Sequence, residues 1–205
     1  MKQTPIKKTT YKTINTNSKY TYENQNSKFI AQAHKIKNKE QIKQILKQLK
    51  SEHPKSNHIP YAFRIGIINQ EIGFSDDGEP TGSAGKPIYF EIKGKELQNT
   101  LITVVRYFGG IKLGVGGLTK AFGTASKNVI EIENSIIELP ICETKIINFE
   151  YSKLKIIENF CKKYNITISN KIFENNCEFI IEIPILKNKI SDEFFKLNKI
   201  SIKNK

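Results

Sequence analysis

Five glycines fall within nine residues, from Gly109 to Gly117, and cationic side chains surround them. Glycine backbone accepts conformations and close approaches that other residues resist. Successive backbone N–H groups at the start of a helix bind anions, and nearby cations add charge-assisted contacts to phosphate. The segment therefore predicts a phosphate-binding loop. Its predicted ligands are glycine amides, flanking cations and one aromatic ring: Gly109, Gly110, Gly114, Gly116, Gly117, Arg106, Lys112, Lys120 and Tyr107. The alternative is a tight strand-to-helix crossover whose glycines serve packing alone.

A second unusual run, residues 74–87, places three carboxylates close together in Asp76, Asp77 and Glu79. Such carboxylates could hold Mg²⁺ together with a substrate phosphate, or they could pair with the cations of the glycine segment. Ordinary turn formation is the third interpretation, since Asp-Asp-Gly and Glu-Pro favour turns. We favour the turn or the pairing over the metal, and we predict neither a metal nor a cofactor. The polar residues that complete the predicted site are Thr81, Ser83 and Lys86.

No arrangement of residues predicts catalysis. Hydroxyl side chains stand beside the carboxylates, and the chain has three histidines, His34, His53 and His58. No spacing singles out a nucleophile with its base and orienting acid. The glycines match neither the phosphate loop of nucleotide hydrolases nor the dinucleotide fingerprint, because Pro80 and Thr119 occupy required glycine positions. We therefore expect a binding protein rather than an enzyme, with no catalytic residues.

The net charge of +13 is unevenly distributed. Residues 1–60 carry +10, residues 61–143 carry −2 and residues 144–205 carry +5. The amino-terminal excess could attract nucleic-acid phosphates; a solvated lysine-rich surface is the alternative, which we slightly favour. Only two of the 33 basic residues are arginines, Arg64 and Arg106, which suggests that these positions need a planar guanidinium.

Composition also excludes several classes of protein. No stretch reaches the roughly 20 apolar residues of a membrane-spanning helix, and the amino terminus lacks the apolar core of a secretory signal. The three cysteines, Cys142, Cys161 and Cys177, form no metal-binding pair, so reduced thiols are expected. These features predict a cytoplasmic protein without a membrane partner, and they give no indication of its oligomeric state.

Hydrophobic periodicity predicts the elements that carry these motifs. A nearly continuous apolar run, residues 99–107, is typical of a buried central strand and leads straight into the glycine segment. A helix is expected to follow from Gly116 or Gly117, so the segment joins a strand to a helix start. Thr81 or Ser83 is expected to cap the helix after the acidic run. The other expected elements are strands over 11–14, 27–34, 61–68 and 70–75, and a helix through 42–49 that ends before His53.

The remaining sequence predicts a second domain. Residues 131–139 are acidic and irregular, and we place a linker at 136–143 between domains of residues 1–135 and 144–205. The second domain has the order strand, helix, strand, strand, helix, strand, which is the split-βαβ, ferredoxin-like motif. The predicted fold class is therefore α+β in two domains. The expected elements are strands over 145–151, 166–173, 177–183 and 199–202, and helices capped by Ser152 and Ser191.

The two unusual runs resemble the signature motifs of the YigZ/IMPACT family, formerly catalogued as uncharacterised. Asp-Asp-Gly-Glu-Pro-Thr-Gly-Ser-Ala-Gly-Lys-Pro spans residues 76–87, and Arg-Tyr-Phe-Gly-Gly-Ile-Lys-Leu-Gly lies within residues 105–122. Lys120 and Phe122 stand where the family usually has Arg and Tyr. The resemblance to bacterial two-domain members implies a first domain like domain IV of elongation factor G and a second like its domain V. Eukaryotic members regulate translation, which implies partners in the translation machinery.

We therefore expect a non-enzymatic, translation-associated protein that binds RNA or the ribosome through the glycine segment. Two alternatives stay open. One is a Mg²⁺-dependent enzyme acting on a phosphorylated small molecule, with the acidic run as its metal site. The other is a protein–protein interaction module that binds a regulator through the helix at 42–49 and the basic amino-terminal arm.

Overall fold

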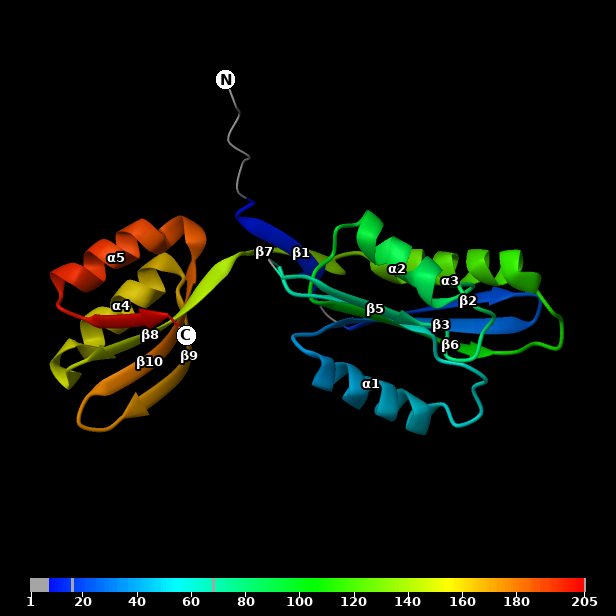
Figure 1. The fold of residues 1–205 in the computed structure, drawn as a ribbon, viewed down its shortest axis with the longest axis horizontal. Helices are drawn as coiled ribbons and strands as arrows, with labels where there is room; N and C mark the ends of the chain where they lie inside the picture. The colour runs from blue at the N-terminus through cyan, green and yellow to red at the C-terminus, as the bar shows by residue number, and fades with distance from the viewer. Residues whose placement is uncertain (1–7, 16, 68, 205) are drawn as a thin grey trace, which may run out of the picture. The chain divides into compact units, whose positions relative to one another are not determined.

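The computed structural model describes residues 8–15, 17–67 and 69–204. Contacts divide the chain into two compact units. Tyr11–Leu139 form the first, and the described residues 8–10 and 140–204 form the second. Figure 1 shows the elements of each unit. Both units combine helices with antiparallel sheets, which confirms the predicted α+β class. The domain limits 1–135 and 144–205 stay a prediction, as does the likeness to elongation factor G.

A five-stranded antiparallel sheet forms the centre of the first unit, in the order β2-β3-β6-β4-β5. Its middle strand β6 is buried along all but its last residue, as the apolar run predicted. The sequence did not predict β2, because its polar residues alternate only between exposed and half-buried positions. The strands are β2 (Ser18–Asn24), β3 (Ser27–Lys35), β4 (Tyr61–Ile65), β5 (Glu71–Ser75) and β6 (Thr100–Tyr107).

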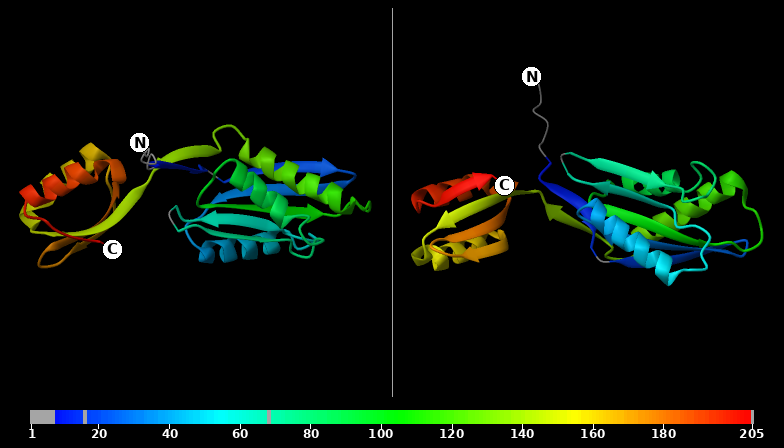
Figure 2. Two further views of the ribbon diagram at one scale, coloured as in Figure 1. Left: turned by 45° about the horizontal axis from the view of Figure 1, so that its top comes forward. Right: turned by 60° about the horizontal axis from the view of Figure 1, so that its bottom comes forward.

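Helices cover both faces of this sheet. As Figures 1 and 2 show, α1 (Lys39–Glu52) lies on one face, and α2 (Gly85–Gly94) and α3 (Gly114–Ile130) lie side by side on the other. The larger core lies between the sheet and the α2–α3 pair, where the Phe29 and Phe122 rings meet edge to face with centroids 5.1 Å apart. The described helices include none long and apolar enough to cross a membrane.

Most of the predicted linker at 136–143 is strand rather than irregular backbone, and the boundary between the two units, after Leu139, falls within it. β7 (Ile136–Pro140) pairs with β1 (Thr10–Ile14), and β8 begins at Cys142. Of the two paired strands, only β1 was predicted. A strand whose partner lies more than 100 residues away has little local signal, because pairing rather than intrinsic preference forms it.

The second unit has the predicted ferredoxin-like order. Its four strands form an antiparallel sheet in the order β11-β8-β10-β9, and hydrophobic side chains of α4 and α5 join its core. Two expected caps are wrong. Ser152 lies in a short 3₁₀ turn before α4, and Ser191 is buried inside α5. The elements are β8 (Cys142–Phe149), α4 (Leu154–Tyr164), β9 (Thr167–Phe173), β10 (Cys177–Pro184), α5 (Asn188–Leu197) and β11 (Ser201–Asn204).

Candidate functional site

The first carboxylate of the acidic run, Asp76, caps helix α2. Its Oδ1 accepts hydrogen bonds from the N–H groups of Ala84 (3.0 Å) and Gly85 (2.8 Å), and its Oδ2 accepts one from Gly82 (2.8 Å). Burial raises the pKa of Asp76, but these three bonds outweigh it and lower the pKa below its usual value. The expected caps Thr81 and Ser83 are wrong, because Asp76, nine positions before the first helical residue Gly85, supplies the capping carboxylate.

Asp77 holds the other side of the same loop. Its Oδ2 accepts a hydrogen bond of 2.8 Å from the Ile59 N–H, and its carbonyl oxygen lies 2.6 Å from His58 Nδ1. A carbonyl can only accept, so Nδ1 carries the proton. A side chain on the next residue, Gly78, would meet the His58 ring at 2.8 Å, and its φ of +91° also favours glycine. The loop therefore keeps one fixed conformation against the start of β4.

Glu79 and Arg106 form a buried ion pair that joins the acidic run to the end of β6. The Arg106 Nη1 donates to both carboxylate oxygens of Glu79 at 2.7 Å, and the two residues are 7% and 6% exposed. The guanidinium also lies between the rings of Phe29 and Phe108, at 5.7 and 5.5 Å from their centroids. The predicted pairing of the two runs is thus confirmed through Glu79. Arg106 itself is not placed to contact a ligand in solvent.

The glycine segment begins with backbone that is already held by the protein. The Phe108 N–H donates to Asn57 Oδ1 (2.9 Å), and the Gly109 N–H donates to Ser27 Oγ (3.1 Å). A Cβ on Gly109 would lie 2.0 Å from the carbonyl carbon of Asn26, in the turn between β2 and β3. Gly109 is therefore glycine because another backbone passes beside it, which is the packing role left open from the sequence.

Most of the rest of the segment is exposed. Gly110 and Gly114 have φ values of +86° and +68°, so both positions favour glycine. Helix α3 begins at Gly114, two residues before the predicted start, and no side chain of its N-cap residue Leu113 caps it. Gly116 has a free side-chain position with no atom within 4 Å. Within the described chain, the first amides of α3 therefore remain available to an anion.

The clearest concave surface near these motifs is the groove between α2 and α3, which we call the lysine groove. It has a cavity volume of about 490 Å³, and three of its ten lining residues are lysines. One acid, Glu91, also lines it, and burial raises the pKa of that carboxyl, partly opposed by Lys127. The lining residues are Gly82, Lys86, Pro87, Phe90, Glu91, Thr119, Lys120, Gly123, Thr124 and Lys127.

The structure thus separates the predicted site residues into groups. Lys86 and Lys120 lie together in the lysine groove, and Lys112 is exposed on the glycine loop. Tyr107 lies elsewhere: its hydroxyl is 2.8 Å from His53 Nδ1, and its ring packs with the core beneath α1. Thr81 is exposed and Gly117 half-buried, while Ser83 is fully buried, and its hydroxyl has no partner in the described chain.

Sequence reasoning identified only Lys86 and Lys120 of the ten lining residues, and the most consequential of those it missed are Phe90 and Lys127. Each could have been found by helical spacing, because Phe90 lies four residues after Lys86 and Lys127 seven after Lys120. Among the residues that the structure describes, no group of three or more His, Cys, Asp or Glu side chains is placed to hold a metal ion.

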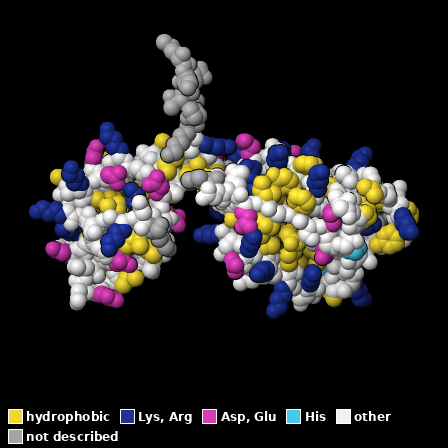
Figure 3. All heavy atoms as spheres, in the orientation of Figure 1, with side chains coloured by type: hydrophobic (Ala, Val, Ile, Leu, Met, Phe, Trp, Pro, Cys, Tyr) yellow, Lys and Arg dark blue, Asp and Glu magenta, His cyan; other side chains and the backbone are white. Residues whose placement is uncertain are grey.

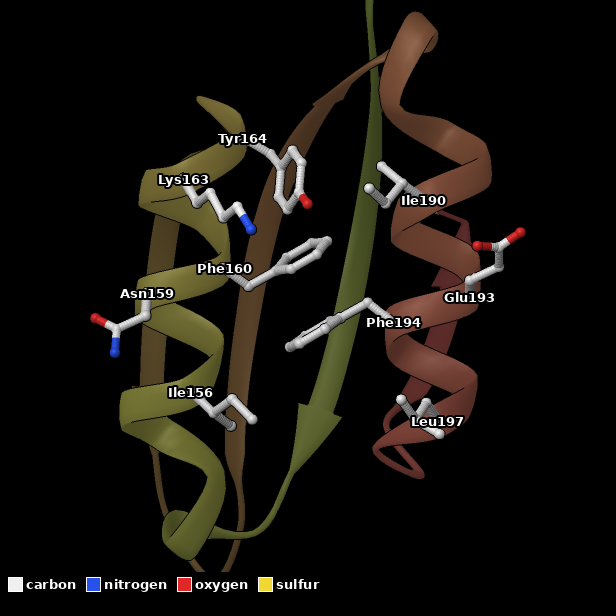
Figure 4. Close-up of a pocket in the computed structure, with 9 residues that line it drawn as sticks. All are labelled: Ile156, Asn159, Phe160, Lys163, Tyr164, Ile190, Glu193, Phe194 and Leu197. Carbon is white, nitrogen blue, oxygen red and sulfur yellow. The ribbon is translucent and has the colours of Figure 1, made fainter.

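A second groove, in the other unit, lies between α4 and α5 and has a volume of about 430 Å³. Figure 4 shows the rings of Phe160 and Phe194 reaching toward each other from the two helices; they stack with centroids 3.7 Å apart. Its lining is largely apolar, with one lysine, Lys163, and one acid, Glu193. Balanced charge gives this groove no preference for anions.

Comparisons with known proteins agree with the motifs. The model described as "Impact N-terminal domain" matches residues 25–130. A curated relative from Haemophilus influenzae, "IMPACT family member", is 33% identical over 77% of this chain and 77% of its own length. "IMPACT family member YigZ" of Escherichia coli is 32% identical over 78% of this chain and 79% of its own. A solved structure, "Crystal structure of an hypothetical protein", is 25% identical, covers 97% of this chain and 98% of its own, and has a TM-score of 0.73. The chain belongs to the IMPACT family.

Proposed function

We propose that this protein is a translation-associated regulator that binds RNA phosphates in the lysine groove and on the neighbouring glycine loop. The observation that carries the proposal is the meeting of three lysines, Lys86, Lys120 and Lys127, from two helices around one groove. Like charges placed together repel, so such a surface is favourable when it neutralises a polyanion.

The chemistry of the groove supports phosphate in particular. Thr119 and Thr124 add hydroxyl donors to the three ammonium groups. Gly116 lies one helical turn before Lys120, so the uncapped start of α3 continues the same helix face. Helix amides and lysines together favour a negatively charged group.

The acidic run and Arg106 have a positioning role in this proposal. Asp76 fixes the start of α2, and the Glu79–Arg106 pair fixes the acidic run to β6, from which the glycine loop departs. The Asp76 contacts hold the start of α2, which borders the groove, and the ion pair holds the end of the strand that leads into the glycine loop. Variants of these residues are therefore expected to act on folding before they act on binding.

The proposed role in translation is supported by membership of the IMPACT family. Members of the IMPACT family in eukaryotes regulate translation, as the resemblance implies, and a phosphate-binding surface suits a partner made of RNA. Co-sedimentation with ribosomes, with and without ribonuclease, tests this setting. Sedimentation that depends on intact RNA supports it, and absence of the protein from the ribosomal pellet contradicts it.

RNA affinity as a function of salt tests the groove itself. For single strands each neutralised phosphate contributes about −0.7 to the slope of log K against log salt, so three lysines predict a slope of about −2. The double variant Lys120→Gln/Lys127→Gln should reduce the slope to about −0.7. Lys47→Gln is the matched control, because Lys47 is an exposed lysine of α1 on the opposite face of the sheet. Equal slopes for all three proteins would overturn the proposal.

A further inference from the structure

An exposed aromatic row borders the lysine groove. Phe90, on α2, lines the groove and is 51% exposed, and Phe74 on β5 is 50% exposed. Tyr89 connects them: its ring stacks on Phe74 at 28° with centroids 6.0 Å apart, and lies 6.2 Å from Phe90. Figure 3 shows hydrophobic side chains gathered over α2 and β5 with basic side chains at their edge. Large rings are usually buried, so this exposure calls for a partner.

The composition of the groove favours a nucleotide over an apolar protein segment. Lys86 Nζ lies 5.8 Å from the centre of the Phe90 ring, so a cation and an aromatic face are offered side by side. Lys120 and Lys127 line the α3 side of the same groove. A nucleotide presents the complementary pair, a flat base and a phosphate. An apolar peptide would leave three ammonium groups to be desolvated without partners.

We propose that the lysine groove binds single-stranded nucleic acid, with one unpaired base stacked on Phe90 and adjacent phosphates held by the groove lysines. This inference rests on the proposed function, and it adds the class of nucleic acid. Bases in a duplex are stacked on their neighbours and offer no free face, whereas unpaired bases stack readily on exposed rings. A volume of about 490 Å³ lies within the range of sites that hold small ligands.

The Phe90→Leu variant tests the stacked base, since leucine keeps an apolar side chain and loses the aromatic face. We expect its affinity for a labelled single-stranded RNA to fall at least about fivefold, as for the loss of one stacked base. Affinity for an RNA duplex of equal length and for tripolyphosphate should not change. Phe173→Leu is the matched control, because Phe173 on β9 is also 51% exposed and lies outside the lysine groove.

A 2-aminopurine base placed within the single strand gives a direct readout, because its fluorescence is quenched on stacking. Quenching by the natural protein that is lost in Phe90→Leu supports the inference. Unchanged single-strand affinity in Phe90→Leu overturns it, and so does an equal loss for single strand, duplex and tripolyphosphate. The double lysine variant tests the proposed phosphate site independently of the stacked base. If it retains the full salt slope, the proposed phosphate site is wrong.

Discussion

Removing the Asp76 carboxylate tests whether the acidic run serves as a cap. Asp76→Ala deletes the acceptor of three backbone hydrogen bonds of 2.8 to 3.0 Å at the start of α2. Hydrogen bonds to a charged group contribute about 1.5–3 kcal/mol each when buried, but Asp76 is only half-buried and water can replace part of them. At about 0.7 kcal/mol each the loss is about 2 kcal/mol, the upper end for an N-cap replacement.

The Asp76→Asn variant distinguishes the contributions of the two carboxylate oxygens. An amide oxygen can still accept from Ala84 and Gly85, as Oδ1 does, while the bond from Gly82 and the charge are lost. We expect a loss of about 1 kcal/mol, near a single hydrogen bond. Urea unfolding followed by circular dichroism measures both variants, with Thr81→Ala as control, since Thr81 is exposed one position before Gly82.

The pH dependence of the same variants follows from the lowered pKa of Asp76. A carboxyl whose pKa is lower in the folded state stabilises the protein above its unfolded pKa of about 3.9. That contribution is lost as the pH falls through the folded value. The difference in free energy of unfolding between the natural protein and Asp76→Ala should therefore become smaller below about pH 4. Equal urea midpoints for Asp76→Ala and Thr81→Ala at neutral pH would refute the capping role. Stabilisation by Mg²⁺ that disappears in Asp76→Asn would favour the metal interpretation instead.

Three further perturbations address other parts of the first unit. Burial lowers the pKa of His34 from 6.5 to about 4, so the neutral form is favoured in the folded state. The free energy of unfolding therefore falls as the pH drops from 6.5 toward 4, by about 3.4 kcal/mol at most at about 1.36 kcal/mol per unit. The urea midpoint of His34→Gln should lack that part of the acid sensitivity. Arg106→Met leaves the Glu79 carboxylate buried without its partner and should cost about 3–5 kcal/mol, much of it recovered by adding Glu79→Leu in a double-mutant cycle. Gly109→Ala places a Cβ 2.0 Å from the β2–β3 turn and should destabilise the protein by about 1–3 kcal/mol. Gly116→Ala, with open space around it in a helix, should stabilise the protein by up to about 1 kcal/mol. Thermal unfolding that ranks the two variants in the opposite order would contradict the assigned roles.

The fold was predictable where local pattern and burial agree. The apolar run of β6, the helix ended by His53 and Pro54, and the βαββαβ order of the second unit all carry strong local signals. β2 was missed because none of its residues is fully buried, so it carries no clear apolar alternation although it pairs with the adjacent β3. β7 was missed because it gains strand structure by pairing with β1, more than 100 residues away. The boundaries of α3 and α5 shifted by a few residues, as expected where no side chain marks the helix start.

The candidate site was predictable as motifs but not as a surface. The sequence indicated that Arg106 has a special role, and the structure shows a guanidinium committed to Glu79 inside the protein. Helical spacing places Lys120 and Lys127 on one face of α3, but which residues of α2, Lys86 and Phe90 among them, lie opposite depends on how α2 packs against α3. That packing is a tertiary contact, and no spacing within one helix determines it.

The buried pair of Glu79 and Arg106 also constrains how this protein can diverge by descent. Loss of either residue alone leaves the other buried with an unpaired charge, so an intermediate carrying one substitution is selected against. Lineages that abandon the pair are expected to have exchanged both positions together, for two apolar residues or for the reversed charges. The two signature runs, although separated along the chain, should therefore be inherited as one character.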